Sequence, residues 1–185
     1  MTYYGGKELA AAFRTVRKNT IQIAEDIPEN KYDFKPAPDS RSVRETLAHV
    51  ATSTNFQHAV HSTKVTDMKT VNFPELFQRF VAEEQKPRTK AELVGYLKSE
   101  GDTFAAFLES LPEPFLSEVV TMTPQGGGGQ KTRFEMLLGA KEHEMHHRGQ
   151  LMTIERILGV VPHLTRQMQE RMAQMQASQQ AAGQR

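Results

Sequence analysis

Two histidines, His143 and His147, stand four residues apart in a segment whose apolar residues recur at helical spacing. Residues at i and i+4 stack on one side of a helix, so both imidazoles can reach a common point. A single core histidine usually finds a backbone partner. Burying two imidazoles in register without partners is unfavourable, and one metal ion would satisfy both. The apolar residues that share their arc are Met136, Ala140, Leu151, Ile154 and Leu158.

A metal site that performs catalysis commonly uses three protein ligands and keeps one position open. His49 is the favoured third ligand, because it lies two turns into another helical segment and in line with Ser53 and Phe56. His58 and His61, nearer the end of that segment, are the competing candidates. The residues predicted to hold the metal are therefore His49, His143 and His147.

The other two histidines of the chain are less suited to the site. His146 points off the apolar arc of its helix, which indicates a surface or supporting position. His163 follows Pro162, outside the helix, and has no partner at a useful spacing.

The run from His143 to His147 also matches the H-E-x-x-H pattern of zinc peptidases, in which the glutamate acts as general base. The longer form of that motif requires Gly and His where this chain has Gln150 and Thr153, and no substrate-binding sheet is predicted. A peptidase is thus the weaker alternative. Glu144 is expected either to pair with Arg148 on the helix surface or to orient a ligand imidazole.

Four long segments with helical periodicity must position these residues. They begin near Lys7, Ser42, Thr89 and Thr132, and the last three open with the S/T-x-x-E pattern of a capping box. The fold class predicted is all-α, a four-helix bundle. Between the second and third helices lies a long crossover, about residues 66–88, with a short helix near residues 75–83.

Residues 1–162 are expected to form one domain and residues 163–185 a helical or partly disordered tail. Met168, Met172 and Met175 make a narrow apolar line in that tail, which is either a fraying end or a surface for a partner. Gly126 to Gly129 predict an exposed, mobile loop that borders the site. Residues 116–122 could be extended, but they cannot form a sheet alone.

The composition of the 185-residue chain excludes several classes of function. Without cysteine there are no disulfides or thiolate ligands. The 23 Lys and Arg residues against 22 Asp and Glu residues form no basic block, so nucleic acid is a poor partner. The first 20 residues contain no apolar signal core, and no stretch is apolar enough to span a bilayer. We expect a soluble, cytoplasmic protein.

Three stretches of the chain resemble the DinB-like family, also called damage-inducible or YfiT-like metalloproteins. They are residues 27–36, which match the connector after the first helix, residues 42–50 around His49, and residues 143–151. The resemblance covers about residues 7–160 and implies a four-helix bundle with three histidine ligands, two of them the first and last histidines of the third stretch. It further implies that the bound ion is nickel or zinc and that the protein often forms a dimer. Characterised relatives include thiol-dependent transferases and a maleylpyruvate isomerase.

The favoured function is therefore that of a divalent-metal-dependent transferase or hydrolase. Its substrate would be a small molecule, and a low-molecular-weight thiol is a candidate cofactor. The alternative is a non-catalytic metal-binding module of the stress response. No catalytic side chain beyond the metal ligands can be assigned from the sequence, and a homodimer is expected from the resemblance.

Overall fold

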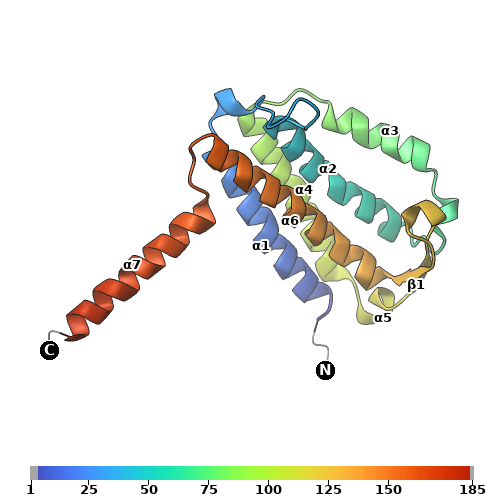
Figure 1. Ribbon diagram of the computed structural model, residues 1–185. Helices are drawn as coiled ribbons and strands as arrows, with labels where there is room; N and C mark the ends of the chain where they lie inside the picture. Colours follow the sequence, from blue (N-terminus) through green and yellow to red (C-terminus); the bar gives the residue numbers. More distant parts are fainter. Residues whose placement is uncertain (1–3, 184–185) are drawn as a thin grey trace.

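The computed structural model describes residues 4–183 and is mostly helical (Figure 1). The prediction of an all-α fold is confirmed. In chain order the elements are α1 (Gly6–Asp26), η1 (Glu29–Lys31), α2 (Val43–Ser62), η2 (Met68–Thr70), α3 (Phe73–Glu84), α4 (Lys90–Ser110), α5 (Glu113–Leu116), β1 (Val119–Thr121), η3 (Pro124–Gly126), β2 (Gln130–Thr132), α6 (Arg133–Ile157) and α7 (His163–Gly183).

The bundle is formed by α1, α2, α4 and α6. Both α1 and α2 pack against α4 and against α6, so α2 and α6, which bear the three histidines, lie side by side. The apolar stripes predicted for the helices form the core. Phe13, Leu47, Leu97 and Leu151 are each at most 1% exposed, one from each bundle helix.

Side-chain caps fix where the helices begin. The Ser42 hydroxyl accepts from the Glu45 amide while the Glu45 carboxylate accepts from the Ser42 amide, and Thr89 and Glu92 repeat this exchange. At α6 the Thr132 hydroxyl accepts from the Glu135 amide. The caps at α2 and α4 are thus reciprocal, whereas the one recorded at α6 runs in one direction, and all three satisfy amides that the first helical turn leaves unpaired.

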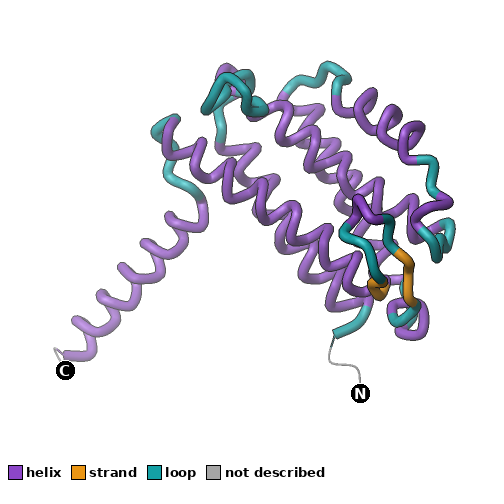
Figure 2. The backbone as a smooth tube through the Cα atoms, turned by 45° about the vertical axis from the view of Figure 1, so that its right-hand side comes forward, coloured by secondary structure: helices purple, strands orange, loops and turns teal. Residues whose placement is uncertain are grey.

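The crossover between α2 and α4 contains α3, which lies along α2 on one side of the bundle (Figures 1 and 2). None of its residues is buried, and Phe77 remains 57% exposed. Its Phe73 ring stacks against Phe56 of α2, with centroids 6.3 Å apart. This helix is therefore a thin cover on the bundle rather than part of its core.

The glycine run forms the turn of a small hairpin, in which β1 pairs antiparallel with β2 and Val119 faces Thr132. Gly127, Gly128 and Gly129 have φ of 94°, 66° and 72°, values that other residues rarely adopt. The expected exposure holds for Gly126, Gly127 and Gly129, whereas Gly128 is partly buried. What the sequence did not indicate is a partner strand, which residues 130–132 supply.

Helix α7 projects away from the bundle (Figures 1 and 2). Met168, Met172 and Met175 are 58%, 50% and 63% exposed, so the chain's own bundle does not cover the methionine line. Only the base of α7 is fixed, where Arg166 pairs with Asp26 at 2.6 Å. No helix among residues 4–183 is both long and apolar enough to cross a membrane.

Candidate metal centre

The structure brings His49, His143 and His147 together, one from α2 and two from α6. The Nε2 atom of His143 lies 3.1 Å from Nε2 of His49 and 3.2 Å from Nε2 of His147. One ring nitrogen from each histidine lies within 4.8 Å of the others. Two nitrogens that bind one tetrahedral zinc at about 2.0–2.1 Å would be separated by about 3.3 Å. The observed spacing fits that requirement.

The outer nitrogens of two of these rings face hydrogen-bond acceptors. Nδ1 of His49 lies 2.8 Å from the Glu84 carboxylate, and Nδ1 of His147 lies 2.8 Å from the Gln150 carbonyl oxygen. A neutral imidazole carries one proton, and an acceptor on Nδ1 keeps that proton there. The Nε2 lone pairs of both rings therefore point inward.

His143 cannot satisfy both inward lone pairs, because its Nε2 carries at most one hydrogen. At least one close pair of ring nitrogens thus lacks a hydrogen between them. A cation at their centre would accept all three lone pairs, which is the arrangement of a three-histidine metal site. The donor set therefore fits a divalent ion such as zinc or nickel.

The pKa values of two ligands favour the neutral form that a metal requires. Burial, followed by the charges of His147 and His49, lowers the pKa of His143 from 6.5 to about 4. Burial also lowers the pKa of His147, which its hydrogen bond to Gln150 partly opposes. Both imidazoles are then uncharged at neutral pH, so neither must first lose a proton in order to bind an ion.

The remaining histidines lie elsewhere. His58 packs against the Phe107 ring at 4.7 Å between centroids, and His61 is buried beside Arg133. His146 is exposed and contacts Gln150, which is consistent with the position off the arc expected from the sequence. His163 is 4% exposed and lies 3.2 Å from Asn19, at the base of α7.

Comparison with known proteins places this architecture in a family. The sequence profile of the DinB superfamily matches residues 12–151. The chain belongs to the DinB superfamily. YjoA, an uncharacterized protein of Bacillus subtilis (strain 168), is 28% identical over 153 residues, which cover 82% of this chain and 90% of YjoA. The crystal structure of YjoA superposes with a TM-score of 0.62, at 27% identity over 82% of this chain and 92% of that one.

Two further structures of similar fold carry functional descriptions. YfiT from Bacillus subtilis, described as a probable metal-dependent hydrolase with an unusual four-helix bundle topology, matches with a TM-score of 0.66. It is 13% identical over 86% of this chain and 91% of YfiT. A mycothiol-dependent maleylpyruvate isomerase matches with a TM-score of 0.60 at 13% identity, over 82% of this chain but 63% of the isomerase. At this identity the likeness concerns the fold.

Glu144 of this DinB-superfamily protein does not form the expected surface pair with Arg148. It is 1% exposed, and its two oxygens lie 2.9 and 3.1 Å from Nε of Arg17 on α1. The guanidinium also donates to the Leu97 carbonyl on α4 and the Val50 carbonyl on α2. The residue lies between the site histidines in sequence, but its side chain faces the bundle interior.

This buried ion pair has two consequences for the DinB site. It ties all four bundle helices together beside His49 and His143, and so holds α2 and α6 in register. In addition, the glutamate of the H-E-x-x-H motif is bound to Arg17 through both of its carboxylate oxygens. A zinc peptidase needs that glutamate free beside the metal as general base, so the geometry does not support a peptidase.

A cavity of about 390 Å³ adjoins the histidines of this DinB site and is called here the metal cavity. His49, Phe56 and Gln57 of α2 form one wall, and Gly139 and His143 of α6 form another. Helix α3 covers the opening with side chains that include Phe77, Phe80 and Glu84. Glu84 is a supporting residue that could not be identified from the sequence, because α3 carries no recognisable motif.

Proposed function

We propose that this protein is a metal-dependent enzyme that transfers or hydrolyses a group on a small molecule. The observation that supports this most is the convergence of three Nε2 atoms at the edge of a cavity large enough for a substrate. The metal would be zinc or nickel. A low-molecular-weight thiol is the proposed cofactor, which the fold shared with a mycothiol-dependent isomerase supports.

In the proposed reaction His49, His143 and His147 would hold the ion beside the metal cavity. A divalent ion with three neutral ligands keeps its full charge and lowers the pKa of a thiol or water bound to it. The Glu84 carboxylate accepts a hydrogen bond from Nδ1–H of His49 and so fixes the orientation of that ring. Phe77 and Phe80 of α3 add apolar side chains to the wall of the metal cavity.

A small panel of assays tests this proposal. Zinc- or nickel-loaded protein would be incubated with low-molecular-weight thiols plus electrophiles, and separately with activated esters. We expect turnover that disappears in His49→Ala and persists in His58→Ala, a histidine of the same helix outside the site. A protein that binds metal but turns over none of these compounds would favour the alternative, a non-catalytic metal-binding module of the stress response.

A further inference from the structure

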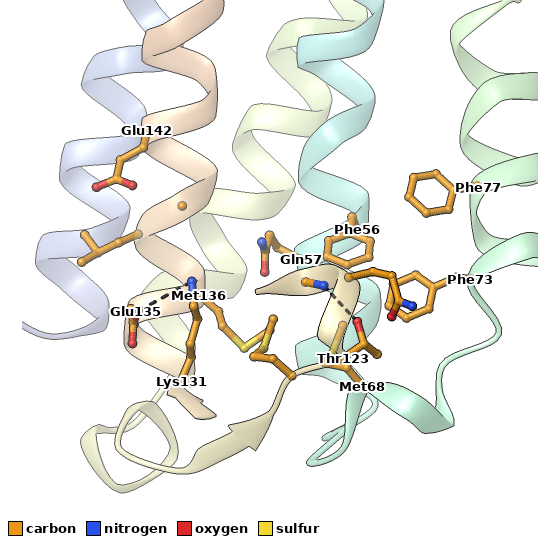
Figure 3. A pocket seen from close by; sticks show the side chains of 15 residues that line it. Phe56, Gln57, Met68, Phe73, Phe77, Thr123, Lys131, Glu135, Met136 and Glu142 are labelled. Carbon is orange, nitrogen blue, oxygen red and sulfur yellow. Dashed lines mark hydrogen bonds and ion pairs between the residues drawn. The ribbon is translucent and has the colours of Figure 1, made fainter. Parts of the chain in front are cut away.

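A second, larger cavity of about 880 Å³ lies between α2, α3, the hairpin and the start of α6 (Figure 3). Three phenylalanines and three methionines are among the residues that line it, and it is called here the Phe–Met cavity. Gln125 and Gly126 of the glycine turn close one side of it. The apolar side chains that line it most prominently are Phe56, Phe73, Phe77, Met68, Met122 and Met136.

The Phe–Met cavity and the metal cavity adjoin each other. Phe56, Gln57, Phe77 and Gly139 line both of them. Gly139 precedes His143 by one helical turn, and a Cβ atom added to it would meet no atom within 4 Å. Open space therefore lies beside Gly139 at the junction of the two cavities.

The two cavities differ in their charges. The wall of the metal cavity carries one cationic group, Arg41, and one carboxylate, Glu84, which accepts a hydrogen bond from His49. In the Phe–Met cavity the one lining cation, Lys131, lies 3.7 Å from the Glu135 carboxylate, and Glu142 adds a further negative charge. An anionic group is therefore disfavoured in the Phe–Met cavity, whereas a divalent ion held by the three histidines would attract it to the metal cavity.

We infer that the substrate is amphipathic: a polar, electron-donating head binds at the metal, and an apolar acyl or aryl tail extends past Gly139 into the Phe–Met cavity. This inference rests on the proposed function and adds a substrate class to it. Phe56 and Phe73 present flat apolar faces to such a tail, and methionines adapt to its shape. Cavities of about 300–1,000 Å³ are typical of small-molecule sites.

Alkyl hydroxamic acids test this inference, since their head groups chelate zinc and their tails vary in length. Calorimetry on zinc-loaded protein would compare acetohydroxamic with octanohydroxamic acid. Each methylene moved from water into an apolar site strengthens binding about fourfold. We expect octanohydroxamic acid to bind at least about 100-fold more tightly than acetohydroxamic acid, because its tail adds six methylenes.

Two glycine variants of α6 locate the tail. Gly139→Leu would fill the junction of the cavities, whereas Gly149→Leu, on the exposed face of the same helix, is the matched control. We expect the ratio of the affinities for octanohydroxamic and acetohydroxamic acid to fall close to one in Gly139→Leu, because the longer tail loses its place. Gly149→Leu should keep the wild-type ratio. An equal loss in both variants would contradict the assigned path.

Methionine methyl groups provide an independent NMR readout in protein labelled with ¹³C-methyl methionine. Octanohydroxamic acid should shift the signals of Met68, Met122 and Met136, and leave those of the exposed α7 methionines unchanged.

The outcomes separate this inference from the proposed function. Equal affinity for both hydroxamic acids, or unmoved cavity methyl signals, would overturn the amphipathic substrate while leaving the metal site intact. Failure of the protein to bind zinc would overturn the proposed function and, with it, the assigned position of the head.

Discussion

His49 and His143 are separated by 94 residues, yet their Nε2 atoms lie 3.1 Å apart. The contact joins the first turns of α2 to the middle of α6, next to the buried pair of Arg17 and Glu144. Two ring nitrogens at this distance, with a third from His147 equally close, are best explained by an ion that all three would bind.

Glu84 should strengthen metal binding without touching the metal. Its carboxylate accepts from Nδ1 of His49, and loss of such a partner typically weakens metal affinity about 10- to 100-fold. We expect a loss of this size in Glu84→Ala and a smaller one in Glu84→Gln, which retains an acceptor. Competition with a chromogenic chelator measures it. Glu83→Gln, which alters the neighbouring carboxylate that pairs with Lys86 and Arg88, should bind like the wild type.

Removal of one partner of the buried Arg17–Glu144 ion pair should destabilise the bundle far more than loss of an exposed ion pair. Glu144→Gln leaves the Arg17 guanidinium, 4% exposed, without its counter-ion, and such changes cost about 3–5 kcal/mol. Glu109→Gln is the matched control, because it breaks an α1–α4 pair with Arg14 whose side chains are both 46% exposed, where about 0–1 kcal/mol is expected. Urea unfolding measures both. Similar losses in the two variants would contradict the structural role assigned to Glu144.

His61 should make the metal-free protein less stable as the pH falls. Burial, followed by the charge of Arg133, lowers its pKa to about 4, whereas in the unfolded chain it titrates near 6.5. Between these values the unfolded state binds more protons, so the free energy of unfolding decreases from pH 6.5 toward pH 4. The free energy of unfolding, measured with urea, should differ less between pH 7 and pH 5 in His61→Phe than in the wild type. An unchanged difference would refute this contribution.

The exposed methionines of α7 are the proposed contact of a homodimer. An uncovered apolar line on a projecting helix favours a partner, and a second copy of the chain is the simplest one. In the full-length chain, joint replacement of Met168, Met172 and Met175 by Gln should shift the mass measured by light scattering toward the monomer. Equal masses for the variant and the wild type would show that α7 has no part in assembly.

Local patterns in the sequence were sufficient to predict the helices of the bundle and the face that His143 and His147 share. The i, i+4 spacing of His143 and His147 within an apolar stripe reports directly which face they share. The capping boxes at Ser42 and Thr89 likewise fix helix starts from four adjacent residues. Each of these features depends on a short stretch of chain, which a single sequence displays.

Contacts between distant segments could not be predicted in this way. Glu144 was expected to pair with Arg148 one turn away or to orient a ligand imidazole. Its actual partner, Arg17, is 127 residues distant in sequence. Glu84 reaches His49 from a helix whose packing the sequence does not reveal. Side-chain partners across helices depend on how the helices rotate and pack, and periodicity does not report that.

The most direct test of the central claim is the affinity of metal-free protein for zinc and nickel, measured by calorimetry for the wild type and its histidine variants. We expect one ion per chain in the wild type and a loss of at least about 100-fold in affinity for His49→Ala, His143→Ala and His147→Ala. His58→Ala should bind as the wild type does. Absence of binding by the wild type, or undiminished binding by the three site variants, would contradict the metal centre.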